Sequence, residues 1–149
     1  MKGTIISGKE ISEKILQDLK TKVDFYTHEA LNRVPKLVVI TIGEDPASKV
    51  YVRNKEKACE KVGIIFENIR FTEKDTYTSI TMQLLNVIKS DDVDGMIIQL
   101  PIVSNVLTDL EKQKICELVP DSLDVDGFGV RSKMAVYEGC KDKEAFYPC

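Results

Sequence analysis

Two short apolar runs constrain the fold of this chain more than any other feature. They are L-V-V-I-T-I at residues 37–42 and G-M-I-I-Q-L at residues 95–100. Neither run alternates apolar with polar residues, as a strand with one face in water would. Both therefore predict strands buried on two faces, which is typical of a parallel sheet covered by helices. Residues 64–71 predict a further strand.

Segments with helical periodicity separate these runs. Apolar residues recur at helical spacing behind a capping-box sequence at 7–10, and they predict an amphipathic helix over about residues 8–27. A second helix is predicted to begin after Asp45 and Pro46 and to end at Gly63, because these residues favour a helix start and a helix stop. The other helix signals are Ile80, Leu84 and Ile88 at helical spacing, and T-x-x-E at 108–111 ahead of Pro120.

Strands that alternate with helices of this length predict one three-layer α/β/α domain over residues 1–149. Its sheet should be mainly parallel with right-handed crossovers, and 149 residues suffice for one hydrophobic core. From residue 121 to 149 the periodicity fades, and we predict no regular element there. Because the sequence stops at F-Y-P-C without a helix cap or polar tail, we expect the chain to be part of a longer protein.

Charge and hydrophobicity exclude several classes of partner. The net charge is −3, and no run of Lys or Arg is interleaved with aromatic residues, which argues against nucleic acids and anionic membranes. No apolar run approaches the roughly twenty residues of a membrane span. The first residues also lack the apolar core of a secretory signal. We therefore expect a cytoplasmic protein that binds a small molecule.

The four cysteines, at 59, 116, 140 and 149, are far apart and form no C-x-x-C pair. His28 is the one histidine, so the usual ligands of a structural zinc are missing. We expect no metal site and no disulfide, with free thiols in a reducing compartment. His28 itself is predicted at the end of the first helix, where a cation meets the helix dipole favourably.

The second predicted helix carries a notable pattern of side chains. Ser48, Tyr51 and Lys55 follow one another at spacings of three and four, so they should share one face. An aromatic ring beside a primary amine suits a flat heteroaromatic substrate whose reaction requires proton transfer. A solvated helix with a half-buried Tyr and a surface Lys gives the same pattern, and the spacing alone leaves both interpretations open.

Gln99 stands at the carboxyl end of the run at 95–100, the edge where active sites of open α/β sheets form. An amide at this place either bonds to the backbone in the core or holds an amine or a substrate group. A carboxylate here would keep Lys55 in its charged form, whereas a neutral amide orients the amine without that bias. We therefore expect Tyr51, Lys55 and Gln99 to share one cleft.

The sequence D-V-D-G-F at 124–128 supplies two more candidate acids. It lacks the ligand series of a calcium-binding EF-hand. A carboxylate that accepts hydrogen bonds from a heterocycle is one interpretation, and a simple turn closed by an Asp side chain is the other. No G-x-G-x-x-G follows any predicted strand, and there is no G-x-S-x-G or P-loop sequence, so no dinucleotide fingerprint is present.

Taken in order, D-P-A-S-K-V-Y-V-R-N-K-E-K-A, G-M-I-I-Q-L-P, D-V-D-G-F and the final Y-P-C closely resemble the bifunctional methylenetetrahydrofolate dehydrogenase/methenyltetrahydrofolate cyclohydrolase (FolD) family. The resemblance covers essentially the whole chain and implies the N-terminal catalytic domain of such an enzyme. In the family, P-C is followed by T-P and by a separate Rossmann domain that binds NADP, which is absent from this sequence.

The resemblance implies oxidation of 5,10-methylenetetrahydrofolate to the methenyl form and hydrolysis of that product to 10-formyltetrahydrofolate. Carried over by matching motif, Lys55 is the proton-transfer residue of the hydrolysis, Gln99 positions it, and Tyr51 stacks on the folate. Asp126 should hold the pterin, and Ser48 should support Lys55. The remaining substrate contacts that the resemblance implies are Ile98, Leu100 and Pro101. It leaves open whether the protein forms a homodimer.

This chain departs from the family after D-V-D-G-F. The family usually continues with His-Pro and then an Asn and a Gly, whereas residues 129–134 read G-V-R-S-K-M, and Leu123 replaces a common Lys. These changes bear on the loop that packs toward the cofactor domain and on dehydrogenase efficiency. Two other hypotheses are a non-catalytic folate-binding or interaction module, which would need no tuned amine, and an unrelated nucleotide-binding domain, which the missing glycine fingerprint disfavours.

Overall fold

The structure is a computed structural model that describes residues 6–30 and 32–138. In chain order its elements are α1 (Gly8–Phe25), a π-helical turn (Tyr26–Ala30), β1 (Lys36–Ile42), α2 (Pro46–Val62), β2 (Ile65–Phe71), α3 (Tyr77–Ile88), β3 (Gly95–Ile98), α4 (Asp109–Glu117) and α5 (Val130–Glu138).

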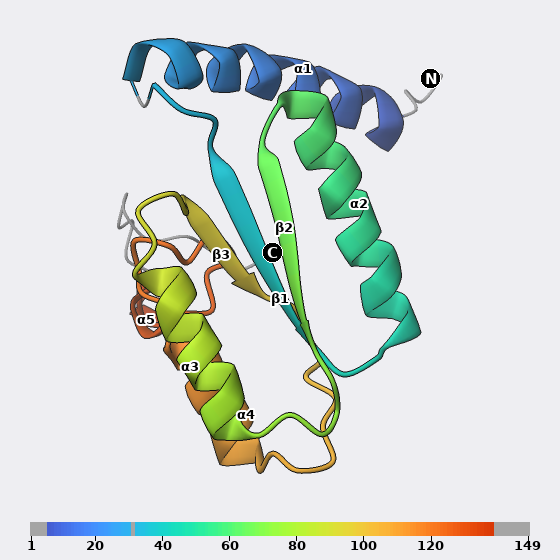
Figure 1. Ribbon diagram of the computed structural model, residues 1–149. Coiled ribbons are helices and arrows are strands. Elements are labelled where there is room, and N and C mark those ends of the chain that lie inside the picture. Colours follow the sequence, from blue (N-terminus) through green and yellow to red (C-terminus); the bar gives the residue numbers. More distant parts are fainter. Residues whose placement is uncertain (1–5, 31, 139–149) are drawn as a thin grey trace.

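Within the described residues the three strands form one parallel sheet in the order β2-β1-β3. Helix α2 lies along one face of the sheet, and α3 and α4 lie along the other (Figure 1). Helix α1 crosses the end at which the strands begin (Figure 1). The predicted three-layer α/β fold with a mainly parallel sheet is therefore confirmed.

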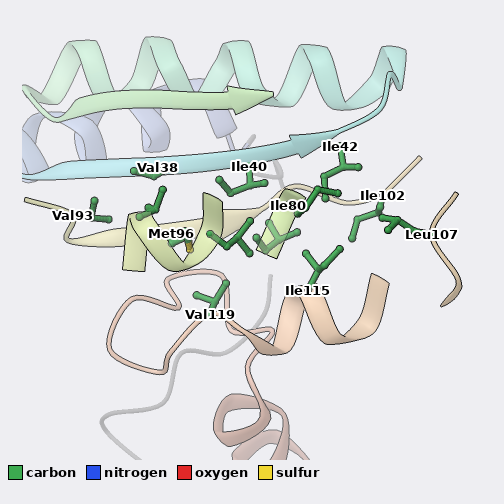
Figure 2. Packing of buried hydrophobic residues seen from close by; sticks show 13 residues of the cluster. Val38, Ile40, Ile42, Ile80, Val93, Met96, Ile102, Leu107, Ile115 and Val119 are labelled. Atoms are coloured by element: carbon green, nitrogen blue, oxygen red, sulfur yellow. The ribbon is translucent and has the colours of Figure 1, made fainter. Parts of the chain in front are cut away.

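Strand β1 is apolar on both faces because both faces are covered. The core between the sheet and helices α3 and α4 includes Val38, Ile40, Ile42, Ile80 and Ile115 (Figure 2). On the other face Val39 packs with Val52 of α2 and Ile97 of β3. Each such side chain stabilises the fold by about 1.5–3 kcal/mol relative to an exposed position.

The helix boundaries follow the signals in the sequence. Asp45 caps α2 through its side chain, and Gly63 ends the same helix in the left-handed conformation with φ of 86°. Thr108 and Glu111 form the reciprocal capping box of α4. Helix α1 begins after Ser7 as predicted, but regular α-helix stops at Phe25 and a π-helical turn containing His28 follows.

Three details differ from the sequence-based prediction. Strand β3 ends at Ile98 rather than at residue 100, because Pro101 has no N–H with which to continue the ladder. From their apolar character, both buried runs are expected to be central strands. Among the described strands β3 is instead an edge strand, although Met96 forms a single bridge to Asp124 on its outer side. The stretch predicted to lack regular structure contains α5, whose short apolar pieces give a weak periodic signal.

An ion-pair network ties together the amino ends of the strands. The guanidinium of Arg33 donates to both carboxylate oxygens of Asp94 at 2.7 and 2.8 Å, and the backbone N–H of Lys36 donates to the same carboxylate at 2.8 Å. Burial opposes ionisation of Asp94, but these hydrogen bonds outweigh it and lower the pKa of that carboxyl below its ordinary value. The network lies at the opposite end of the sheet from Gln99.

Two of the four cysteines lie within the described residues. Cys59 and Cys116 are free thiols, and burial raises the pKa of both. Cys140 and Cys149 lie outside the described residues.

In the described part of the chain, no helix combines the length and the apolar character needed to cross a bilayer.

Candidate active site

The turn after β1 places the start of α2 against the loop that follows β3. Gly43 has a φ of +74°, and a Cβ there would lie 2.1 Å from the carbonyl oxygen of Val103. Asp45 then accepts a 2.7 Å hydrogen bond from the Ser48 N–H, which lowers the pKa of Asp45. Because only glycine combines this backbone with so close an approach, Gly43 sets where α2 begins.

Lys55 and Gln99 form the central polar contact of the site. The Nζ of Lys55 donates a hydrogen bond to Oε1 of Gln99 at 2.8 Å. The Nε2 of Gln99 donates to the carbonyl oxygen of Leu100 at 2.9 Å, and Oγ of Ser48 donates to the same oxygen at 3.1 Å. The Leu100 carbonyl therefore holds the amide group of Gln99 with its oxygen toward the amine.

The other predicted contact residues have different surroundings. Tyr51 lies one turn before Lys55 on α2, and 63% of its surface is exposed, so its ring is free to meet a ligand. Leu100 and Pro101 are exposed beside the amide of Gln99. The side chain of Ile98 packs in the core against α3 and α4. Only its main chain is therefore left to contact a ligand.

The sequence D-V-D-G-F forms a tight loop around Asp124. We call residues 124–129 the Asp124 loop. Oδ1 of Asp124 accepts from the N–H groups of Asp126, Gly127 and Phe128 at 3.3, 2.9 and 3.3 Å, and Oδ2 accepts from Gly129 at 2.6 Å. The interpretation as a turn closed by an Asp side chain is thus right for Asp124. The carboxyl of Asp126 takes no part in closing the turn.

Asp126 lies within electrostatic reach of Lys55. Burial raises the pKa of the Asp126 carboxyl, the positive charge of Lys55 acts against that rise, and the charge of Asp124 adds to it. The net result is a pKa above the ordinary value for Asp. No local sequence pattern predicts that an acid approaches Lys55, because Asp126 lies far from Lys55 along the chain.

Two hollows adjoin these residues. One of about 520 Å³ is lined by Leu100, Pro101, Ile102 and residues of α4, and it is mostly apolar. The other, of about 860 Å³, lies between α2 and β2, and Ser48 is the one predicted site residue in its lining. The predicted proximity of Lys55 and Gln99 is confirmed, whereas a cleft shared with Tyr51 remains a prediction.

Taken together, the described side chains suit proton transfer to a flat polar ligand. They combine an amine fixed by a neutral amide, the partly buried carboxyl of Asp126 and an exposed aromatic ring. No group of three His, Cys, Asp or Glu side chains in the described part of the chain is placed to hold a metal ion. Sequence reasoning missed the Leu100 carbonyl, which accepts from both Gln99 and Ser48, and it did not indicate which acid of D-V-D-G-F closes the turn. Gly43 could have been found, because a glycine between a strand and a helix cap signals a special turn.

Comparison with known proteins assigns a family. Residues 6–126 match the model of the tetrahydrofolate dehydrogenase/cyclohydrolase catalytic domain. The bifunctional protein FolD of Hydrogenobaculum sp. is 39% identical over 149 residues, covering 97% of this chain and 49% of that protein. The crystal structure of FolD from Campylobacter jejuni superimposes with a TM-score of 0.83 at 33% identity, covering 98% of this chain and 49% of that one.

A more distant structure shares the fold. The Trypanosoma brucei methylenetetrahydrofolate dehydrogenase-cyclohydrolase, solved with NADP and an inhibitor, superimposes with a TM-score of 0.72 at 20% identity, covering 85% of this chain and 41% of that one. The present chain spans about half the length of the curated relatives it matches.

Proposed function

The chain belongs to the tetrahydrofolate dehydrogenase/cyclohydrolase catalytic-domain family, and we propose that it supplies the folate-binding and catalytic residues of a two-domain enzyme of one-carbon metabolism. That enzyme oxidises 5,10-methylenetetrahydrofolate to 5,10-methenyltetrahydrofolate and hydrolyses the product to 10-formyltetrahydrofolate. The observation that carries the proposal is the 2.8 Å hydrogen bond between Lys55 and Gln99 at the carboxyl edge of the sheet.

The hydrolysis needs a group that accepts and returns protons. Water adds to the methenyl carbon and gives a proton to the amine of Lys55. The bond from that carbon to N5 then breaks, the hydroxyl proton reaches N5, and the carbon becomes the formyl group. Gln99 holds the amine in place through a neutral oxygen, so that the amine is free to exchange its proton. Positioning of this kind also removes part of the entropic cost of the reaction.

The substrate would be held by an aromatic surface and a polar edge. The exposed ring of Tyr51 provides a stacking face one helical turn from Lys55. The carboxyl of Asp126 would pair with N–H groups of the pterin, and its raised pKa fits a carboxyl shielded from water. Leu100 and Pro101 would contact the folate beside Gln99. Ser48 acts indirectly, through the carbonyl of Leu100.

We propose that the dinucleotide binds outside the described residues, because the starts of α2 and α4 do not fit a pyrophosphate. The N-terminus of α2 is already covered by the carboxylate of Asp45, and that of α4 by the side chains of Thr108 and Glu111. A second anion there would meet like charge. We propose that NADP, with which the Trypanosoma brucei structure was solved, binds outside these residues.

Equilibrium binding tests the proposed function. We expect the protein to bind 5-formyltetrahydrofolate saturably with one site per chain, and Asp126→Asn to weaken binding by roughly ten-fold, as expected for a lost charge-assisted hydrogen bond. Asp109→Asn, whose side chain is fully exposed on α4, is the matched control and should bind normally. Absence of saturable binding by the parent protein would contradict the proposal.

A further inference from the structure

Asp124 is unusual among the described residues, because it is the one acidic or basic side chain that is buried. Only 4% of its surface is exposed. A buried carboxylate is costly unless hydrogen bonds replace its lost water. Here the replacements are the four N–H groups of its own loop, two of which approach within 2.9 Å. An anion held by successive backbone N–H groups fixes the path of that backbone.

The Asp124 loop is in turn fastened to β3. The N–H of Met96 donates to the carbonyl oxygen of Leu123 at 2.7 Å, and Met96 forms a bridge with Asp124. Val125 packs on Gly95, where an added Cβ would lie 2.9 Å from a methyl group of Val125. Strand β3 ends one residue before Gln99, so the loop and Gln99 share one rigid support.

We propose that Asp124 is a positioning residue, which holds the Asp124 loop so that Asp126 faces the folate beside Lys55. The proposal rests on the proposed function. The Asp126 N–H is the first donor to Asp124, and Gly127 follows with φ of +75°, so the chain bends directly after Asp126. Without the Asp124 carboxylate, four N–H groups lose their acceptor and the carboxyl of Asp126 loses its fixed direction.

Gly129 closes the Asp124 loop on its carboxylate. Gly129 donates the shortest of the four hydrogen bonds, and a Cβ at this position would lie 2.8 Å from Oδ2 of Asp124. In this chain, a glycine at 129 allows the loop to close tightly on Asp124 before α5 begins at Val130.

A double-mutant cycle separates positioning from general stability. We expect Asp124→Ala to weaken binding of 5-formyltetrahydrofolate by at least roughly ten-fold in the parent protein. In an Asp126→Asn background the same change should weaken binding by no more than about two-fold, because the group that it positions is already lost. Asp124→Asn keeps one acceptor oxygen toward three of the donors. Its affinity for 5-formyltetrahydrofolate should therefore lie between that of the parent protein and that of Asp124→Ala.

Two further measurements complete the test. Asp75 closes a different turn by accepting from the N–H and Oγ1 of Thr72 at 2.6 and 2.7 Å, so Asp75→Ala is the matched control and should leave folate binding unchanged. Hydrogen exchange, measured without folate, should show the amides of residues 126–129 protected in the parent protein and exposed in Asp124→Ala.

The possible results distinguish the inference from the function on which it rests. If the parent protein fails to bind 5-formyltetrahydrofolate, the proposed function is contradicted and the inference with it. If the parent protein binds, but Asp124→Ala weakens binding equally in both backgrounds or not at all, the inference alone is overturned. Unchanged protection of the four amides in Asp124→Ala would overturn it as well.

Discussion

The amine of Lys55 donates a 2.8 Å hydrogen bond to the side-chain oxygen of Gln99, although 44 positions separate the two residues in the sequence. Lys55 is placed by α2 and Gln99 by the end of β3, and both elements meet at the carboxyl edge of the sheet. The partner of the amine is a neutral amide, held by the carbonyl of Leu100.

Replacing the amide of Gln99 with a carboxylate should impair the hydrolysis. Gln99→Glu would place a negative charge against Lys55 and hold the amine in its ammonium form to higher pH. We expect hydrolysis of 5,10-methenyltetrahydrofolate at neutral pH to fall by at least roughly ten-fold, with activity recovering partly as pH rises. The measurement is a pH–rate profile of both proteins. An unchanged profile would show that the amide has no such role.

The glycine that sets the start of α2 should tolerate no side chain. In Gly43→Ala the left-handed backbone alone costs on the order of 1–3 kcal/mol, and the contact with the Val103 carbonyl adds to it. We expect a clear loss of unfolding free energy in a urea titration. Gly8→Ala is the control, because nothing lies within 4 Å of an added Cβ at this first residue of α1. Equal stability of the two variants would contradict the account.

The Arg33–Asp94 pair should make stability depend on pH in the acid range. The pKa of Asp94 is lowered in the folded protein, so its contribution is complete above the ordinary Asp pKa and is lost as pH falls through the folded value. Asp94→Asn should therefore lower the unfolding free energy at pH 7 by about 1 kcal/mol, and the difference should shrink toward zero in strong acid. Urea titrations at several pH values test this, and a difference independent of pH would refute it.

Local patterns were sufficient to predict most of the fold. The buried runs around Val39 and Ile97, the cap at Asp45 and the stop at Gly63 are each encoded by a few neighbouring residues. Helix α5 was missed because its stability depends on contacts such as that of buried Ala135, which periodicity over so short a segment does not reveal.

The site could be predicted only in part, for a physical reason. The spacing on α2 and the strand-end position of Gln99 suffice to bring Lys55 and Gln99 together. The approach of Asp126 to Lys55 depends on the Asp124 loop, whose shape comes from hydrogen bonds to one buried carboxylate. The two acids have equivalent places in the sequence pattern, and only burial distinguishes the one that holds the loop from the one that faces Lys55.

The central claim is that Lys55 transfers the proton in the hydrolysis of 5,10-methenyltetrahydrofolate. The most direct measurement compares the hydrolysis rate of the parent protein with that of Lys55→Met over a range of pH, with the exposed Lys57→Met as control. Methionine keeps much of the packing of the side chain and removes the amine. We predict that Lys55→Met loses roughly a hundred- to ten-thousand-fold in rate while still binding 5-formyltetrahydrofolate. Near-parental hydrolysis by Lys55→Met would contradict the account.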